Sequence, residues 1–353
     1  MAKIRNPIIV GSGKENLDTE LNTQDILLTN LETVVNDLGG GGYPIEIDDP
    51  NDMTALLVAA NVDKVYLYTG TTTQDYINGD LYVVESQPVL EAYATAQSGV
   101  TYTAVTDLSN YTDEQINAIS KAISNCADIT NSTQTVYLSD GTSISIGATR
   151  SYTLSTQEAV TDRVLGFNHD TLTSSTAYGE ATATGKAGMT WQNVDCLATR
   201  YPMNDTNTNA GGWTGSKMRT STLPTIKALL PSDLQAVIKL VDKKAANGGS
   251  SNYSATVTSS DDLFLLCENE IFGTITYAQD GSNEGTQYEY WVGKSVSDRI
   301  KYYDNAGTPT ATYWWERSSN SSNTGNFCNV NTSGNVNHNS ASNTRGVAFA
   351  YCT

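Results

Sequence analysis

Few side chains in this sequence could carry out nucleophilic or metal-assisted chemistry. It holds two histidines, His169 and His338, and neither has a second histidine at helical ligand spacing, so we predict no zinc site and no metal. No P-loop, Rossmann glycine fingerprint, GxSxG or HExxH motif is present, and we predict no catalytic residue and no cofactor. The odd number of cysteines excludes a complete disulfide framework and predicts reduced, mostly buried thiols. The cysteines are Cys126, Cys196, Cys267, Cys328 and Cys352.

Two acidic loops offer oxygen atoms to a hard cation such as Ca²⁺. They contain Asp48, Asp49 and Asp52 in one case, and Asp261 and Asp262 in the other. Neither has the spaced D-x-D-x-D-G pattern of a dedicated calcium loop. We therefore expect solvated acidic turns.

The richest pattern of polar side chains lies near the C-terminal end of the sequence. A turn at 332–334 between 328–331 and 335–339 predicts a β-hairpin. Period-2 alternation places Asn329 with Asn331 on one face, and the other face carries Cys328 and Val330.

Asparagine is unfavourable in strands by up to about 1 kcal/mol, so its repetition indicates selection for something other than stability. Each amide offers donors and acceptors, and adaptable polar surfaces of this kind are typical of evolved binding sites. We predict a ligand-binding face, with a solvated hairpin of no further function as the alternative. The predicted ligand-binding residues are Asn320, Asn323, Asn326, Asn329, Asn331, Asn335, Asn337, His338, Asn339 and Asn343.

The first part of the chain reads as an attachment segment, residues 1–42, followed by a small β-rich domain, residues 43–110. Apolar residues between 15 and 38 repeat at spacings of 4 and 3, which predicts a short coiled-coil helix or an amphipathic helix packed on its own domain. Four glycines at 39–42 would end it and form a hinge. Alternating residues predict strands at 64–68 and 80–84.

Residues 111–353 are interpreted as one α+β domain. Thr112 and Gln115 form a capping-box signal for a short helix with an apolar stripe of isoleucines. We expect strands at 144–154, 162–167 and 262–267, and helices at 222–230 and 232–243, the latter capped by Ser232. Long loops such as 201–212 separate them, which suggests a functional role for the loops.

A series of short motifs in this domain resembles a bacterial and phage domain family of unnamed function, related to C-type-lectin-like and formylglycine-generating-enzyme-like domains. The motifs occupy 195–203, 210–213, 216–219, 230–234, 262–266, 270–273, 284–288, 314–318 and 345–349. The resemblance implies a C-type-lectin-like fold. It also implies that residues between framework positions vary in proteins diversified by retroelements. The implied framework residues are Trp314, Trp315, Arg317, Phe327, Gly334 and Gly346.

Segments 3–8, 64–70 and 78–82 resemble phage tail-fibre or appendage proteins. The resemblance implies a virion protein made in the host cytoplasm and oligomeric, with a trimer as the commonest state of such fibres. It also implies binding to other tail proteins and to a host-surface glycan or protein. The net charge of −18 disfavours nucleic acid and anionic lipid as partners, and no apolar run is long enough to insert into a membrane. Two alternatives stay open: a retroelement-diversified bacterial or prophage adhesin outside a virion, and an enzyme on the formylglycine-generating fold.

Overall fold

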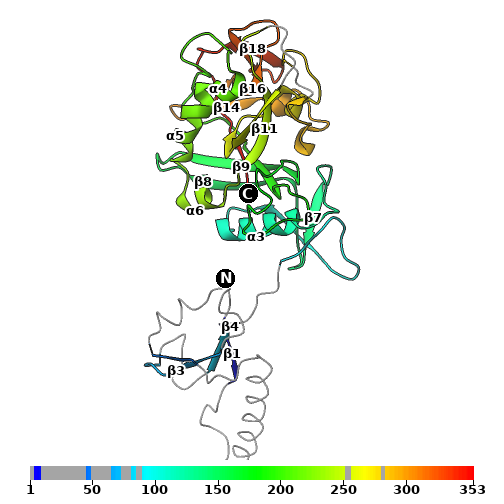
Figure 1. The fold of residues 1–353 in the computed structure, drawn as a ribbon, viewed down its shortest axis with the longest axis vertical. Helices are drawn as coiled ribbons and strands as arrows, with labels where there is room; N and C mark the ends of the chain where they lie inside the picture. The colour runs from blue at the N-terminus through cyan, green and yellow to red at the C-terminus, as the bar shows by residue number, and fades with distance from the viewer. Residues whose placement is uncertain are drawn as a thin grey trace, which may run out of the picture. The chain divides into compact units, whose positions relative to one another are not determined.

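The computed structural model describes residues 4–8, 45–48, 65–72, 81–84, 90–250, 256–279 and 283–353. Its contacts divide the chain into two compact units, Met1–Val89 and Leu90–Thr353 (Figure 1). Each unit is described by itself. No helix among the described residues combines the length and the apolar character needed to cross a bilayer.

The described part of the first unit is a small sheet with strand order β1-β4-β3-β2. Its strands are β1 (Ile4–Ile8), β2 (Ile45–Ile47), β3 (Val65–Tyr68) and β4 (Leu81–Val84). The strands predicted at 64–68 and 80–84 are confirmed as β3 and β4. The predicted coiled-coil helix at 15–38 and the glycine hinge at 39–42 lie outside the described residues.

The largest sheet of the second unit runs β13-β19-β10-β9-β8-β7-β5, with β6 beside β8. Within the described ranges these strands are β5 (Ala92–Tyr93), β6 (Thr103–Asp107), β7 (Thr135–Leu138), β8 (Thr142–Thr153), β9 (Ala159–Phe167), β10 (Met189–Asn193), β13 (Leu263–Phe264) and β19 (Ala350–Cys352). Because β5 and β6 pair with β7 and β8, residues from Leu90 onward, including the stretch up to 110, lie with the C-terminal unit.

Local sequence explains several of these elements. Helix α3 (Asp113–Ser124) begins at the predicted capping box, in which Gln115 N donates to Thr112 Oγ1 and Thr112 N donates to Gln115 Oε1. Its stripe of Ile116, Ile119 and Ile123 is buried in the core. The strands predicted at 144–154 and 162–167 are confirmed as β8 and β9.

The rest of the unit consists of short helices and small antiparallel sheets. Its helical segments are α4 (Gly212–Gly215), η2 (Met218–Thr222), α5 (Leu223–Lys227), α6 (Ser232–Val237), α7 (Glu268–Phe272), η4 (Glu289–Trp291) and η5 (Ser297–Arg299). Its strands are β11 (Val241–Ala246), β12 (Thr256–Asp261), β14 (Lys301–Asn305), β15 (Thr308–Thr312), β16 (Trp314–Ser319), β17 (Asn326–Val330) and β18 (Val336–Ser340).

The predicted α+β class is wrong, because strands make up 35% of the structure and helices 17%, and the strands form several antiparallel sheets. The helix predicted at 232–243 shows how the error arose. Helix α6 ends at Val237, and β11 then pairs residue by residue with β12, burying alternate side chains. Ser232 is not the N-cap; Pro231 holds that position without a side-chain cap. The strand predicted at 262–267 shortens to Leu263–Phe264.

Candidate binding site

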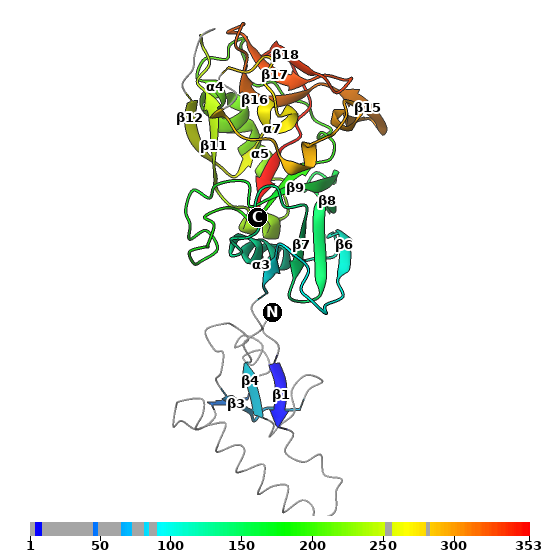
Figure 2. The same cartoon turned by 90° about the vertical axis from the view of Figure 1, so that its right-hand side faces the viewer.

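The predicted hairpin forms two strands of a three-stranded sheet with order β16-β17-β18. This sheet lies at the end of the C-terminal unit away from α3 (Figures 1 and 2). Asn329 pairs with Asn337 and Cys328 pairs with His338, as the alternation predicts. Strand β17 therefore lies in the middle of the sheet, and β18 is its edge.

The turn of the hairpin is fixed by Asn331 and Gly334. The side-chain oxygen of Asn331 accepts from Ser333 N at 2.9 Å and from Asn335 N at 3.0 Å. Gly334 has φ +80°, and a Cβ there would lie 1.7 Å from the carbonyl oxygen of Val296. Only glycine suits this position, because the backbone is left-handed and a neighbouring segment lies directly against it.

Three of the predicted ligand-binding residues are inside the protein. Asn320 and Asn329 are fully buried, and Asn326 is 8% exposed. Both polar atoms of the Asn329 side chain lack a hydrogen-bond partner among the residues that the structure describes. For Asn326 and Asn329 the physical reason is the position of β17, which is paired along both edges, has every residue buried, and cannot present a side chain to a ligand. Asn320 directly follows β16, and its backbone N–H donates to the carbonyl oxygen of Asn326.

The remaining seven residues lie at the surface, and we call them the hairpin surface. Two are exposed and five are half-buried. They are Asn323, Asn331, Asn335, Asn337, His338, Asn339 and Asn343.

Neighbouring side chains hold part of the hairpin surface in place. Arg345 donates to Asn339 Oδ1 at 2.7 Å, and His338 Nδ1 lies 2.7 Å from Asn326 Nδ2. The His338 ring also makes an edge contact with Tyr277 at a centroid distance of 4.7 Å. A ligand would thus meet side chains that are already oriented.

Asn209 supports the loop between β16 and β17 from below. Its buried amide nitrogen donates to the carbonyl oxygens of Asn320, Asn323 and Asn326 at 3.3, 3.1 and 2.9 Å. Sequence reasoning did not single out Asn209, Tyr277 or Arg345. The only available signal for Asn209 was its place in the long 201–212 loop.

The implied framework residues are all in the interior. The indole nitrogens of Trp314 and Trp315 donate to the carbonyl oxygens of Arg299 at 3.0 Å and Tyr201 at 2.8 Å. Phe327 is fully buried, and a Cβ at Gly346 would lie 2.5 Å from Cys196 Sγ. These contacts attach β16 to loops far away in the sequence.

Arg317 is the most heavily bonded framework residue. Its guanidinium uses all five N–H groups, on both carboxylate oxygens of Glu270 and on the carbonyl oxygens of Lys244, Leu265 and Glu284. Burial alone would lower the pKa of Arg317, but the Glu270 carboxylate raises it well above the usual value. Arg317 therefore stays charged and fixes β16 to α7.

Lys243 extends this buried ionic network. Its ammonium lies 2.7 Å from both Asp170 Oδ1 and Glu270 Oε1. Burial alone would raise the pKa of Asp170, but Lys243 holds it below the usual range. The network is a rigid, charge-balanced layer within the C-terminal unit.

The predicted solvated turn at Asp261 and Asp262 is wrong for Asp261. That carboxylate is 4% exposed, pairs with Arg219 at 2.5 Å and accepts from Trp213 Nε1 at 2.8 Å. Asp262 is half-buried and pairs with Lys227. Asp49 and Asp52 lie outside the described residues.

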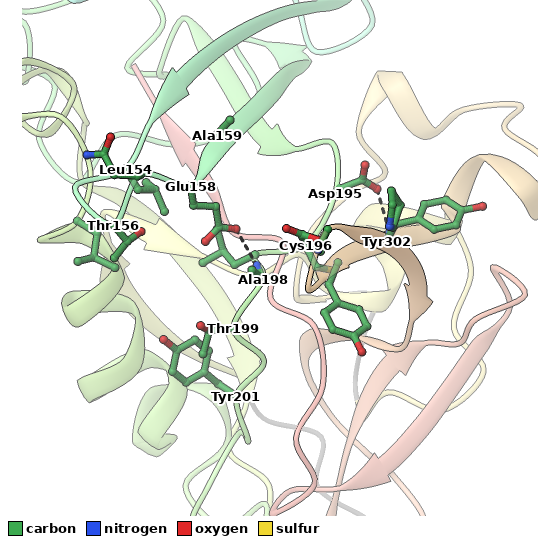
Figure 3. Close-up of a pocket in the computed structure, with 17 residues that line it drawn as sticks. Leu154, Thr156, Glu158, Ala159, Asp195, Cys196, Ala198, Thr199, Tyr201 and Tyr302 are labelled. Atoms are coloured by element: carbon green, nitrogen blue, oxygen red, sulfur yellow. Dashed lines mark hydrogen bonds between the residues drawn. The ribbon is translucent and has the colours of Figure 1, made fainter.

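A separate pocket of about 710 Å³ lies among the turn between β8 and β9, the 195–199 segment and the β14–β15 hairpin (Figure 3). Its acidic groups already bind the backbone: Glu158 accepts from Ala198 N at 2.7 Å, and Asp195 accepts from Tyr302 N at 2.9 Å. Burial raises the pKa of Cys196 to about 12, so its thiol is protonated at neutral pH. No hairpin-surface residue lines this pocket.

All five cysteines are free, as predicted, with Cys126 half-buried and the others buried. Burial, together with the nearby Glu316 carboxylate, raises the pKa of Cys328 well above its usual value. A thiol with a raised pKa is a weak nucleophile at neutral pH.

A family model described as a domain of unknown function (DUF6273) matches residues 192–352, a range that contains the hairpin surface and the framework residues. No curated protein and no solved structure matches the chain.

Proposed function

We propose that the C-terminal unit is the receptor-binding module of a phage tail appendage, and that it binds a glycan or protein on the host-cell surface through the hairpin surface. In this proposal the chain is made in the host cytoplasm, enters the virion with other tail proteins and forms oligomers through its N-terminal segment. The observation that carries the proposal is a concentration of amide side chains on an edge strand above a rigid, buried frame.

The geometry of β18 supports binding. Every residue of this strand is half-buried, so its side chains reach solvent while its backbone is paired to β17. The carboxamides of Asn337 and Asn339 can each donate and accept hydrogen bonds. Because the underlying frame is ordered, a ligand needs to immobilise few groups, and this lowers the entropic cost of association.

The same geometry suits a surface that tolerates sequence change. We propose, from the resemblance to retroelement-diversified proteins, that the hairpin surface is the variable part of the module. Its seven residues lie outside the core, and surface substitutions away from special features usually change stability by less than about 0.5 kcal/mol.

The direct test is binding of the full chain to an array of bacterial surface glycans and surface proteins. A triple variant, Asn335→Ala, Asn337→Ala and Asn339→Ala, should lose a specific hit. A matched control replaces three exposed asparagines far from the hairpin in sequence, Asn110, Asn131 and Asn305, and should keep it.

Unfolding curves of both triple variants accompany the array. Equal binding by the wild-type chain and a folded hairpin variant would refute the assignment of the hairpin surface. A specific hit that depends instead on Tyr302 or Tyr303 would move the site to the pocket beside β14.

A further inference from the structure

A second buried acidic cluster lies beneath the hairpin, and no basic side chain in the described part of the chain forms an ion pair with it. Glu268 in α7, Glu316 in β16 and Cys328 in β17 are each fully buried. One ligand atom from each, two carboxylate oxygens and a sulfur, lies within 4.8 Å of the others. The sulfur of Cys328 is 3.8 Å from Glu268 Oε2.

Glu316 is the unusual member of the cluster. Both of its carboxylate oxygens are buried, and neither has a hydrogen-bond partner in the part of the chain that the structure describes. A buried carboxylate without partners is strongly unfavourable, so such a group normally has a cation or hydrogen-bond donors beside it. Here the protein supplies neither.

In the neighbouring ionic network, buried carboxylates are neutralised by a basic side chain. His169, Asp170 and Glu270 form a similar cluster, and the ammonium of Lys243 lies between its two carboxylates. No lysine contacts Glu268 or Glu316 among the described residues. Arg317 cannot serve, because its five N–H groups are already bonded elsewhere.

The Glu268 carboxylate is held in place by backbone hydrogen bonds. Its two oxygens accept hydrogen bonds from the backbone N–H groups of Thr276, Tyr277 and Ala278. Carboxylates that bind metals are commonly held by such outer hydrogen bonds, which orient them toward the ion. The three amides come from one short segment, so they fix the carboxylate against β16 and β17.

We propose that Glu268, Glu316 and Cys328 bind a structural zinc ion. A thiolate with carboxylate oxygens suits Zn²⁺, whereas Ca²⁺ and Mg²⁺ take oxygen donors only. Ligand atoms around tetrahedral zinc lie about 3.3–3.8 Å apart given its bond lengths, so the cluster closes with small side-chain movements. A water molecule would take the fourth position, as at zinc sites with three protein ligands.

This ion would join α7 to two consecutive strands, β16 and β17, which follow it more than 40 residues later in the sequence. It would stabilise the central strand of the hairpin sheet from below. The proposal does not depend on the receptor-binding function, because it concerns buried residues and not the hairpin surface.

The test uses the full chain, prepared metal-free and loaded with Zn²⁺ or Co²⁺. We expect about one zinc per chain by elemental analysis and native mass spectrometry, together with a thiolate-to-cobalt charge-transfer band in the Co²⁺ form. Cys328→Ser should abolish that band and weaken zinc binding by about tenfold or more. Cys126→Ser, a half-buried thiol outside the cluster, is the matched control and should change neither.

Glu316→Leu provides a second test, because the variant is expected to change thermal stability in opposite directions with and without a bound zinc ion. If zinc is bound, this variant loses a ligand, and the zinc-induced rise in Tm shrinks or disappears. If Glu316 is merely a protonated buried carboxyl, the wild-type chain shows no zinc-induced rise in Tm, and Glu316→Leu is more stable than it. A wild-type chain without stoichiometric zinc and without a cobalt–thiolate band overturns the proposal.

Discussion

Replacing Arg317 by methionine tests whether the buried ionic network holds the binding module together. The side chain is fully buried, and so is its partner Glu270 at 1% exposure. The variant removes two hydrogen bonds to the Glu270 carboxylate and leaves the carbonyl oxygens of Lys244, Leu265 and Glu284 without these donors. Methionine fills much of the volume, so the loss is chiefly polar.

The expected cost follows from these contacts. Removing one partner of a buried ion pair costs about 3–5 kcal/mol, because the other charge stays in the interior. Lys243 still neutralises part of the Glu270 charge, so we expect about 4 kcal/mol in total. Since domains have a net stability of about 5–15 kcal/mol, this is a large fraction of the free energy of unfolding.

Urea unfolding followed by tryptophan fluorescence measures this loss well. All five tryptophans belong to the C-terminal unit and are buried, so they report its unfolding. The control is Lys217→Met, which breaks an exposed pair with Asp205 and should cost about 0–1 kcal/mol. A loss below about 1 kcal/mol for Arg317→Met at an unchanged m-value would refute the assignment of Arg317 as a framework residue.

Three further changes give distinct outcomes. Gly334→Ala should lower the free energy of unfolding by more than about 2 kcal/mol, because strain at positive φ adds to a clash with Val296. Gly293→Ala, which has positive φ but open space around it, should lower it by about 1 kcal/mol. Equal losses in urea unfolding would contradict the clash. Burial lowers the pKa of Lys301 to about 8, so the unfolded state binds one more proton between about pH 8 and 10.5. The free energy of unfolding should therefore rise with pH across this window in the wild-type chain relative to Lys301→Met, and parallel curves would disprove the shift. Asn329→Val removes two buried polar atoms that have no partner among the described residues. It should raise the free energy of unfolding by about 1–2 kcal/mol, and a decrease would show that Asn329 makes a hydrogen bond that the structure lacks.

The hairpin itself was predictable because its determinants are local. The turn residues and the alternation from 328 to 339 fix which residues face each other, and the observed pairing of Asn329 with Asn337 follows from them. The capping box of α3 is similarly contained in four residues. Such short patterns predict the local structure well, because the residues that determine it are neighbours in the sequence.

The burial of Asn329 was not predictable from the same pattern. It depends on β16 pairing with the other edge of β17 and on the elements that cover both faces. Likewise, the apolar spacing at 232–243 suits a helix, and only pairing with β12 turns its second half into a strand. Strong tertiary pairing overrides local preference in both cases.

The position of β17 changes which asparagines can serve recognition. Asn320, Asn326 and Asn329 lie in the interior, where a new side chain must fit a closed space, and insertion of larger groups there costs about 1–3 kcal/mol. The edge strand carries no such limit, whereas the turn is constrained at Asn331 by its side-chain hydrogen bonds and at Gly334 by its left-handed backbone. If this module is diversified, changes that preserve folding should therefore concentrate in the hairpin surface. Random replacement at Asn329 should yield far fewer folded chains than random replacement at Asn337. Equal tolerance at the two paired positions would show that burial does not separate framework from binding residues in this sheet.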